Sequence, residues 1–318
     1  MPRCGTAIFT DPGDYQAAIR EAKFNFTFNN QKDFKARLTW AELRHVRLIR
    51  GQENLPRVAH ISLTPGSVFI ALPVLHGPPL IYDGVEVQPG ELVFHSQGQR
   101  VHQRTRGRSN WGFISLTPEH LVASSRTLTG RDLKLPPVAR ILRPPRRDAA
   151  NLLRLHNEAC RLAETKPEII SHQEVARALE QELIHVLVTC LIRKDVSKYG
   201  AANRRHAGVI DRFESVLRGH LEHNLRVSDL CKAIDVPERT LRMCCARFLG
   251  MSPTRYLRQR RLNMVHAVLR DADTPPASVE EVARRYGFSE LGRFAAIYRT
   301  VFGEIPSMTL RRANFAHS

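Results

Sequence analysis

The sequence lacks long apolar runs, secretory features and metal-binding cysteine motifs. No stretch of about 18 apolar residues is present, which excludes a conventional membrane-spanning helix. The start, "MPRCGTAIFTDPGDY", has no long apolar core of the kind that secretory signals carry, so we expect a cytoplasmic protein. The six cysteines show no metal spacing, and the adjacent pair Cys244 and Cys245 suits neither a disulfide nor a zinc site. We interpret the cysteines as reduced, small apolar residues and expect no cofactor.

Composition is that of an ordinary globular protein, with 42% hydrophobic and 25% charged residues in 318 positions, enough for two domains. The formal net charge of +17 favours a polyanionic partner, most plausibly nucleic acid. The excess is +7 in residues 1–140, +4 in 141–220 and +6 in 221–318. Because the positive charge is spread along the chain, it does not by itself locate a DNA-binding domain.

An internal repeat marks the last third of the chain. Segment 227–257, "VSDLCKAIDVPERTLRMCCARFLGMSPTRYL", matches 279–310 at an offset of 52 and, after one extra residue in the turn, of 53. The matched positions are apolar or are the glycine and proline that bend the chain. Each copy is predicted to form a helix of about 8 residues, a short turn and a helix of about 11, which is helix-turn-helix geometry.

A longer helix is predicted between the copies, within "PTRYLRQRRLNMVHAVLRDA". About 18 residues that rise about 1.5 Å each form a rod of roughly 27 Å. Successive major-groove faces of DNA are about 34 Å apart. A rod of this length can hold two reading helices in adjacent grooves on one side of a duplex.

Two helix-turn-helix units joined by a long helix resemble the AraC/XylS family of bacterial transcription regulators. The resemblance covers about the last 105 residues and depends on Arg261, Leu262, Val282, Ala283, Gly287, Phe288, Phe294, Tyr298, Phe302, Gly303 and Pro306. It implies promoter DNA as the partner, a bacterial cytoplasm with nucleoid association on DNA, and no enzymatic activity. The sequence departs from the family at Cys245, where phenylalanine is common, and at Ser289 and Glu290, where bulkier ring side chains are expected.

The first reading helix has an apolar stripe, and the residues beside it are predicted to contact DNA: Glu238, Arg239, Arg242, Met243, Ala246 and Arg247. Arginine can form a bidentate pair with guanine, worth about 1–3 kcal/mol of discrimination. The resemblance implies that Arg239, Arg242 and Met243 face bases, whereas Ala246 and Arg247 lie nearer the DNA backbone. For Arg247, a solvated charge near the helix end is an equal alternative.

The second reading helix is predicted to contact DNA through Ser289, Glu290, Gly292, Arg293, Ala296 and Arg299. Ser289 is expected to cap this helix. Gly292 allows close approach to DNA, and Arg293 and Arg299 reach phosphates; the alternative is that Gly292 packs on a neighbouring helix beside solvated arginines. Because Gly292 and Ala295 stand where the first copy has arginines, we predict that the first unit reads sequence and the second positions the protein.

The N-terminal part is β-rich, with runs such as "RHVRLIRG", "PPLIYDG" and "NWGFISLTP" separated by glycine and proline. "VQPGELVFH" resembles a turn of cupin-like barrels, which implies a small sensing barrel and an α+β fold for the chain. A barrel of this kind can enclose an effector, and the candidate lining residues are Phe69, Leu72, Phe94, Trp111 and Phe113. The alternative is that these side chains form the barrel core.

Five histidines of this part lack the close pairing of a cupin metal site: His60, His76, His95, His102 and His120. We expect structural or surface roles for them. After a Pro-Pro break, helices are predicted at 148–164 and 171–195. The second has an apolar face that serves either dimerisation or packing onto the barrel.

The predicted domains are 1–142 for sensing, 143–206 for dimerisation and the linker (194–206), and 207–318 for DNA binding, with helix-turn-helix units at about 227–250 and 279–303. We expect a sequence-specific transcription activator, with promoter DNA, a second copy, a small-molecule effector and RNA polymerase as partners. Two alternatives stay open: a cupin-type metalloenzyme with a basic accessory domain, and a nonspecific architectural DNA binder.

Overall fold

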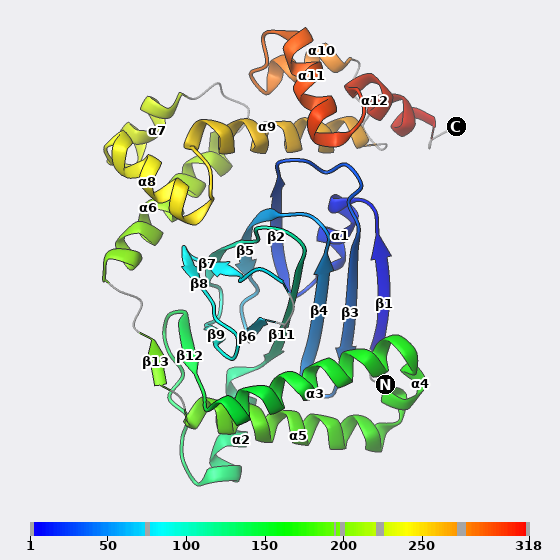
Figure 1. Cartoon of the computed structure of the whole chain (residues 1–318), viewed down its shortest axis with the longest axis vertical. Coiled ribbons are helices and arrows are strands. Elements are labelled where there is room, and N and C mark those ends of the chain that lie inside the picture. The colour runs from blue at the N-terminus through cyan, green and yellow to red at the C-terminus, as the bar shows by residue number, and fades with distance from the viewer. Residues whose placement is uncertain are drawn as a thin grey trace. The chain divides into compact units, whose positions relative to one another are not determined.

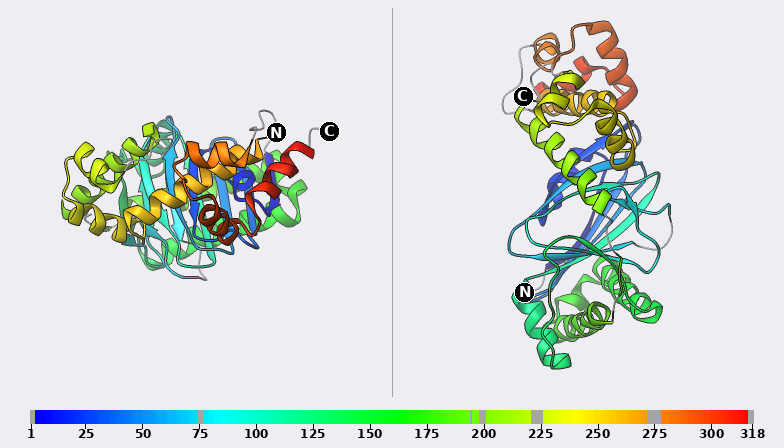
Figure 2. Two further views of the ribbon diagram at one scale, coloured as in Figure 1. Left: turned by 90° about the horizontal axis from the view of Figure 1, so that it is seen from above. Right: turned by 90° about the vertical axis from the view of Figure 1, so that its left-hand side faces the viewer.

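The computed structural model describes residues 3–73, 77–193, 195–197, 201–220, 226–271 and 278–315. The chain divides into two compact units. Unit 1 contains Met1–Phe24, Phe34–Pro56 and His60–Gly200, and unit 2 contains Asn25–Asp33, Arg57–Ala59 and Ala201–Ser318. Figure 1 labels the elements, and Figure 2 gives two further views. None of the described helices is long and apolar enough to cross a membrane.

The strands form two antiparallel sheets whose alternating side chains place apolar residues in the interior. The larger sheet has the order β1-β3-β4-β11-β6-β9-β12-β13, with β1 at Arg3–Phe9, β3 at Ala36–Glu42, β4 at Arg47–Glu53, β11 at Ser109–Leu116, β6 at Val68–Pro73, β9 at Leu92–His95, β12 at Arg140–Arg143 and β13 at Asp195–Ser197. The smaller sheet has the order β2-β5-β10-β7-β8, with β2 at Ala22–Phe28, β5 at Arg57–Leu63, β10 at Arg100–Arg104, β7 at Ile81–Tyr82 and β8 at Val85–Glu86.

The predicted α+β fold is confirmed, with β-sheets before an all-α C-terminal part. Among the described strands the sheets are open, so the expected single closed barrel is replaced by two antiparallel sheets. The sequence did not predict the three strands before residue 44, which complete one edge of each sheet. It also missed the helix α2 (Pro118–Thr129). A short helix, α1 (Pro12–Ala18), lies between the first two strands.

Helices α3 (Arg146–Thr165) and α5 (Gln173–Ile192) lie side by side across one face of the larger sheet, joined by α4 (Pro167–Ser171) (Figures 1 and 2). Their buried side chains form one core with the sheet, including Leu48 and Ile114 from the strands and Leu187 from α5. Most of the apolar face predicted in 171–195 is therefore used within unit 1, which supports the packing alternative. Dimerisation through this region stays a prediction.

The described helices of unit 2 include the two predicted helix-turn-helix pairs and the helix between them, followed by a last helix, α12, which the sequence did not predict. They are α6 (Ala201–His220), α7 (Val227–Ala233), α8 (Glu238–Phe248), α9 (Pro253–Arg270), α10 (Val279–Arg285), α11 (Leu291–Phe302) and α12 (Pro306–Phe315). The linker expected at 194–206 differs, because α6 already begins at Ala201 and β13 pairs with β12. Both reading helices and the helix between them form where the sequence predicts them.

Candidate nucleic-acid interface

The turn between the two helices has the same hydrogen bond in both copies of the repeat. In the first copy, the Val236 amide donates to the Cys231 carbonyl at 3.0 Å. In the second, the Phe288 amide donates to the Ala283 carbonyl at 2.9 Å. Donor and acceptor are each displaced by 52 positions, which is the offset found in the sequence. The predicted helix-turn-helix repeat is therefore confirmed at the level of the backbone.

Left-handed backbone conformations also recur at equivalent positions. Inside the turns, Asp235 has φ 52° and Gly287 has φ 80°. After the reading helices α8 and α11, Gly250 has φ 69° and Gly303 has φ 81°. Glycine adopts this region without steric cost, which explains its use at three of the four positions. The chain therefore enters and leaves both reading helices in the same way.

Each reading helix buries one stripe and leaves the opposite face exposed. The stripes are Leu241, Cys245 and Phe248 in α8, and Phe294, Tyr298 and Val301 in α11, all at most 2% exposed. Helix α9 contacts both helix-turn-helix units, through α8 in one and through α10 in the other. This packing fixes which side of each reading helix is free to approach DNA.

In each half of unit 2, a buried tyrosine forms a hydrogen bond to a neighbouring helix. Tyr256 on α9 donates its hydroxyl proton to buried Glu214 on α6. Tyr298 on α11 donates to Thr309 Oγ1 on α12 at 2.9 Å and lies 2.6 Å from Nδ1 of His266 on α9. Burial raises the pKa of both tyrosines, so each hydroxyl stays protonated and can donate. The second reading helix is thus held against both of its neighbours.

The predicted DNA-contact residues all lie on exposed surface. In α8 these are Glu238, Arg239, Arg242, Met243, Ala246 and Arg247. At the second unit they are Ser289, Glu290, Gly292, Arg293, Ala296 and Arg299. The apolar side chain of Met243 is 49% exposed.

Arg242 is paired with Glu238, a contact that the sequence analysis did not anticipate. Nε and Nη2 of Arg242 donate to Glu238 Oε1 at 2.9 and 2.5 Å. The signal was present, since the two residues are four apart on one helix. The side chains are 64% and 45% exposed, so the pair is weak and can be exchanged for a base edge. Glu238 therefore holds Arg242 over the exposed face of the helix.

For the second unit, one local prediction and one alternative are corrected. The residue that caps α11 is Glu290, without a side-chain cap hydrogen bond, so Ser289 does not cap the helix. A Cβ added to Gly292 would meet no atom within 4 Å, so the glycine does not pack against a neighbouring helix. Gly292 lies on an open face, and its close approach to DNA stays a prediction.

Known proteins match this region. A family described as helix-turn-helix domain matches residues 230–312. The XylDLEGF operon transcriptional activator of Pseudomonas putida is 30% identical over 162 residues, 51% of this chain and 48% of that protein. Residues 230–312 therefore form a helix-turn-helix domain of the AraC/XylS kind.

Further relatives carry regulatory names. The probable thc operon regulatory protein of Rhodococcus erythropolis is 32% identical over 108 residues, 34% of this chain and 32% of that protein. A solved structure of a probable AraC family transcriptional regulator from Rhodopseudomonas palustris CGA009 is 32% identical, covers 33% of this chain and 96% of that chain, and has a TM-score of 0.31. The chain spans about half the length of the first relatives it matches.

The effector pocket predicted from the sequence is not assembled as expected. Its five candidates are buried, but Leu72 and Phe94 belong to the core that α3 and α5 cover. Phe69, Trp111 and Phe113 lie on the opposite face of the sheet, with Trp111 and Phe113 stacked at 5.9 Å between ring centroids. Residues an odd number apart on a strand point to opposite faces, which sequence proximity concealed.

The candidate histidines are spread through unit 1. His60, His95 and His102 are buried, and the His60 and His102 rings lie 4.8 Å apart between centroids. His120 is half-buried and stacks on His45, whereas His76 lies outside the described residues. Within the described ranges, no group of three or more histidine, cysteine, aspartate or glutamate side chains is arranged to hold a metal ion.

Proposed function

We propose that this protein is a sequence-specific transcription activator that places α8 and α11 in adjacent major grooves of promoter DNA. The observation that carries the proposal is the pair of matching helix-turn-helix units, each with its predicted contact residues on the exposed face. Helix α9 has 18 residues, which at about 1.5 Å per residue suits the spacing of neighbouring grooves.

The two units have different tasks in this proposal. The first reads bases, because Arg239, Arg242 and Met243 offer a guanine-binding pattern and an apolar contact for a thymine methyl group. The second positions the protein, because Arg293 and Arg299 reach phosphates beside a glycine that lets the helix approach closely. Both units then contribute to the salt dependence of binding to any DNA. Only the first unit contributes to the preference for one sequence.

The proposal extends to partners and location. Several relatives are named as operon transcriptional activators, which supports activation and a promoter as the DNA target. We include self-association, a small-molecule effector, contact with RNA polymerase, and a bacterial cytoplasmic location that becomes nucleoid-associated on DNA. None of these partners requires catalysis, so the proposed protein is a regulator and not an enzyme.

The test compares Arg242→Ala with Arg299→Ala in full-length protein, using fluorescence anisotropy with a selected DNA site and single-base variants of it. Arg242→Ala is expected to lose about 1–3 kcal/mol of discrimination at one base pair. Arg299→Ala is expected to weaken binding to every site equally and to reduce the salt dependence by about one phosphate contact.

The control is Arg126→Ala, which removes an exposed arginine paired with Asp132 outside the reading helices. It is expected to bind DNA as the wild type does. If Arg242→Ala instead weakens all sites uniformly and unrelated DNA competes as well as the selected site, the protein is an architectural binder and sequence reading by α8 is wrong.

A further inference from the structure

Two histidine rings of unit 1 stack on each other between segments that are distant in sequence. His45 lies in the turn between β3 and β4, and His120 lies in the first turn of α2. Their ring centroids are 4.2 Å apart and their planes are inclined by 20°. Both rings line a groove of about 1520 Å³ that α2, α5 and the β3–β4 turn border. The stack is separate from the reading helices and from the aromatic residues considered above.

The three segments are fastened to one another at this point. The Glu180 carboxylate on α5 accepts hydrogen bonds from the backbone amides of His45 at 2.7 Å and of Val46 at 3.2 Å. Helix α2 packs against α5 (Figure 1), and its Leu121 is buried in the core that Leu43 of the turn also joins. Histidine is the side chain that ordinarily titrates between pH 5 and pH 8. The ring stack is therefore the contact between the turn and α2 on which mild acid would act.

The surroundings of His120 favour a neutral imidazole. Its Nε2 is buried and has no hydrogen-bond partner among the described residues. A neutral ring can leave this nitrogen without a proton, whereas an imidazolium would bury an N–H group that donates to nothing. The His120 amide also donates to Oγ1 of the N-cap residue Thr117 at 3.2 Å, so the ring lies at the positive end of α2.

Charged groups of the neighbouring segments act on His120 in both directions. Burial lowers the pKa of His120 most, and the facing His45 lowers it next. Glu180 on α5 raises this pKa, and Arg44 in the turn lowers it. The other titratable side chains at the groove and in the first turn of α2 are Glu42, Glu119, His172, Arg177, Glu182 and His185. The net result is a pKa below 6.5, so His120 is neutral at pH 7 and the two rings stack without charge repulsion.

We propose that the His45–His120 stack is a pH-sensitive switch that holds α2 on the β3–β4 turn at neutral pH and releases it in mild acid. When both rings carry a proton, two like charges face each other at 4.2 Å, and the buried Nε2–H group of His120 has no acceptor. Movement of the first turn of α2 away from the β3–β4 turn hydrates His120 and separates the charges. The same movement uncovers Leu121, which is 0% exposed in the stacked state, and widens the groove.

The direction of the response follows from proton linkage. In the released state His120 is hydrated and has its ordinary pKa, whereas in the stacked state its pKa is lowered. The stacked state is therefore favoured above pH 6.5, and this advantage is lost as the pH falls below that value. Release that takes up one proton becomes more frequent by up to about tenfold per pH unit.

The first test follows the histidine rings of the full-length protein by NMR as the pH is lowered, with His120→Gln to assign the His120 signal. The pKa of His120 is expected to lie below 6.5 and to rise in His45→Gln, which removes the facing ring. A pKa of 6.5 or above in the wild type, or the same pKa in His45→Gln, would overturn the proposal.

The second test measures hydrogen exchange of the α2 amides by mass spectrometry at pH 7.5 and pH 5.5, corrected for the intrinsic pH dependence of exchange. Helix α2 is expected to open about five- to tenfold more often at pH 5.5. His45→Gln is expected to reduce this ratio, and His120→Gln to bring it close to one. The amides of β11 in the same sample report global unfolding, which is subtracted.

The matched control is His185→Gln, which changes an exposed histidine of the same groove outside the stack and is expected to respond as the wild type does. Equal opening of α2 at the two pH values, a wild-type ratio in His120→Gln, or loss of the response in His185→Gln would each overturn the proposal. Both tests use the protein without DNA, so failure of the switch is distinguished from failure of the proposed regulatory function.

Discussion

At the scale of single residues, the packing of α3 on the larger sheet depends on a glycine. A Cβ added to Gly112 on β11 would lie 2.5 Å from Cε1 of His156 on α3. The His156 ring is fully buried, with Nε2 3.1 Å from the Ile49 carbonyl oxygen. Ring and backbone both lie in the core, so neither moves without cost.

Gly112→Ala is therefore expected to lower the free energy of unfolding by about 1–3 kcal/mol, the usual cost of overpacking a core. Urea denaturation followed by circular dichroism measures it. The control is Gly107→Ala, where the new Cβ would meet only Pro78 Cγ at 3.7 Å, an ordinary contact. Equal stability of the two variants would show that the sheet and α3 separate easily at His156.

At the scale of elements, the turn of one helix-turn-helix unit predicts the backbone conformation of the turn in the other. Asp235 has φ 52° at the turn position where the second unit has Gly287. A side chain in this left-handed region costs about 1–2 kcal/mol, which aspartate reduces better than most residues. Asp235→Ala is expected to destabilise the protein by about 1 kcal/mol, and Asp235→Gly to leave it unchanged or more stable. Thermal unfolding of the two variants compares them, and a more stable alanine variant would contradict the shared turn.

The helices of unit 2 could be predicted because their signals are local. Apolar spacing predicted α8 and α11, and the helix predicted after the first unit begins at Pro253. The edge strands of unit 1 carry weaker signals. In β1 the sequence alternates too little to indicate a strand, and Ile8 is 68% exposed. Its place depends on pairing with β3 and on contacts with α3 and α4, which are distant in sequence. Such strands depend on partners distant in sequence, which composition does not reveal.

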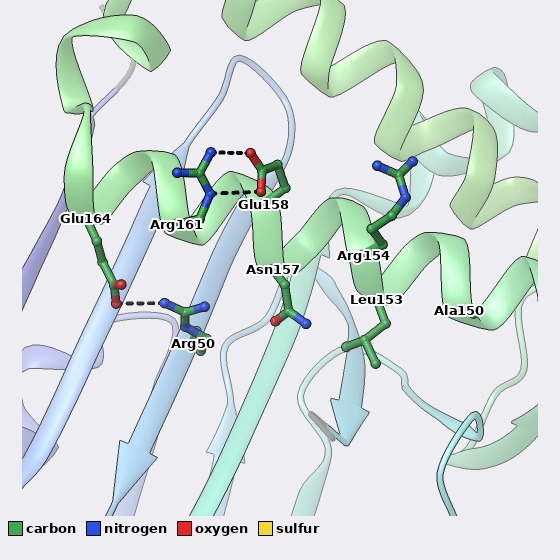
Figure 3. A pocket seen from close by; sticks show the side chains of 8 residues that line it. All are labelled: Arg50, Ala150, Leu153, Arg154, Asn157, Glu158, Arg161 and Glu164. Atoms are coloured by element: carbon green, nitrogen blue, oxygen red, sulfur yellow. Dashed lines mark hydrogen bonds and ion pairs between the residues drawn. The ribbon is translucent and has the colours of Figure 1, made fainter. Parts of the chain in front are cut away.

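The candidate site was also predicted only in part. Exposure of Arg239 and Arg242 follows from the stripe on their own helix, so the sequence was sufficient. The aromatic pocket failed because Leu72 and Phe69 are three residues apart on one strand and face opposite sides of the sheet. Arg50 and Glu164 form an ion pair at 2.7 Å (Figure 3) although they are 114 positions apart, and no local pattern connects them.

At the scale of the whole molecule, buried histidines couple stability to pH. Burial lowers the pKa of His95 on β9 and of His156 on α3 from 6.5 to about 4. Both are therefore neutral in the folded protein at pH 7. Unfolding exposes them, and below pH 6.5 the unfolded chain binds protons that the folded chain does not. Their contribution to stability is present above pH 6.5 and is lost as the pH falls toward 4.

Between pH 7 and pH 5 each buried histidine is expected to remove about 2 kcal/mol from the free energy of unfolding. Urea titrations at both pH values measure the loss. His156→Gln is expected to reduce this pH-dependent loss by about 2 kcal/mol, because glutamine does not titrate, whatever its effect on stability at pH 7. The matched control His172→Gln changes an exposed histidine and is expected to keep the wild-type loss. An unchanged loss in His156→Gln would mean that this imidazole is already protonated in the folded protein. The buried site beside Ile49 and Gly112 would then tolerate a charge.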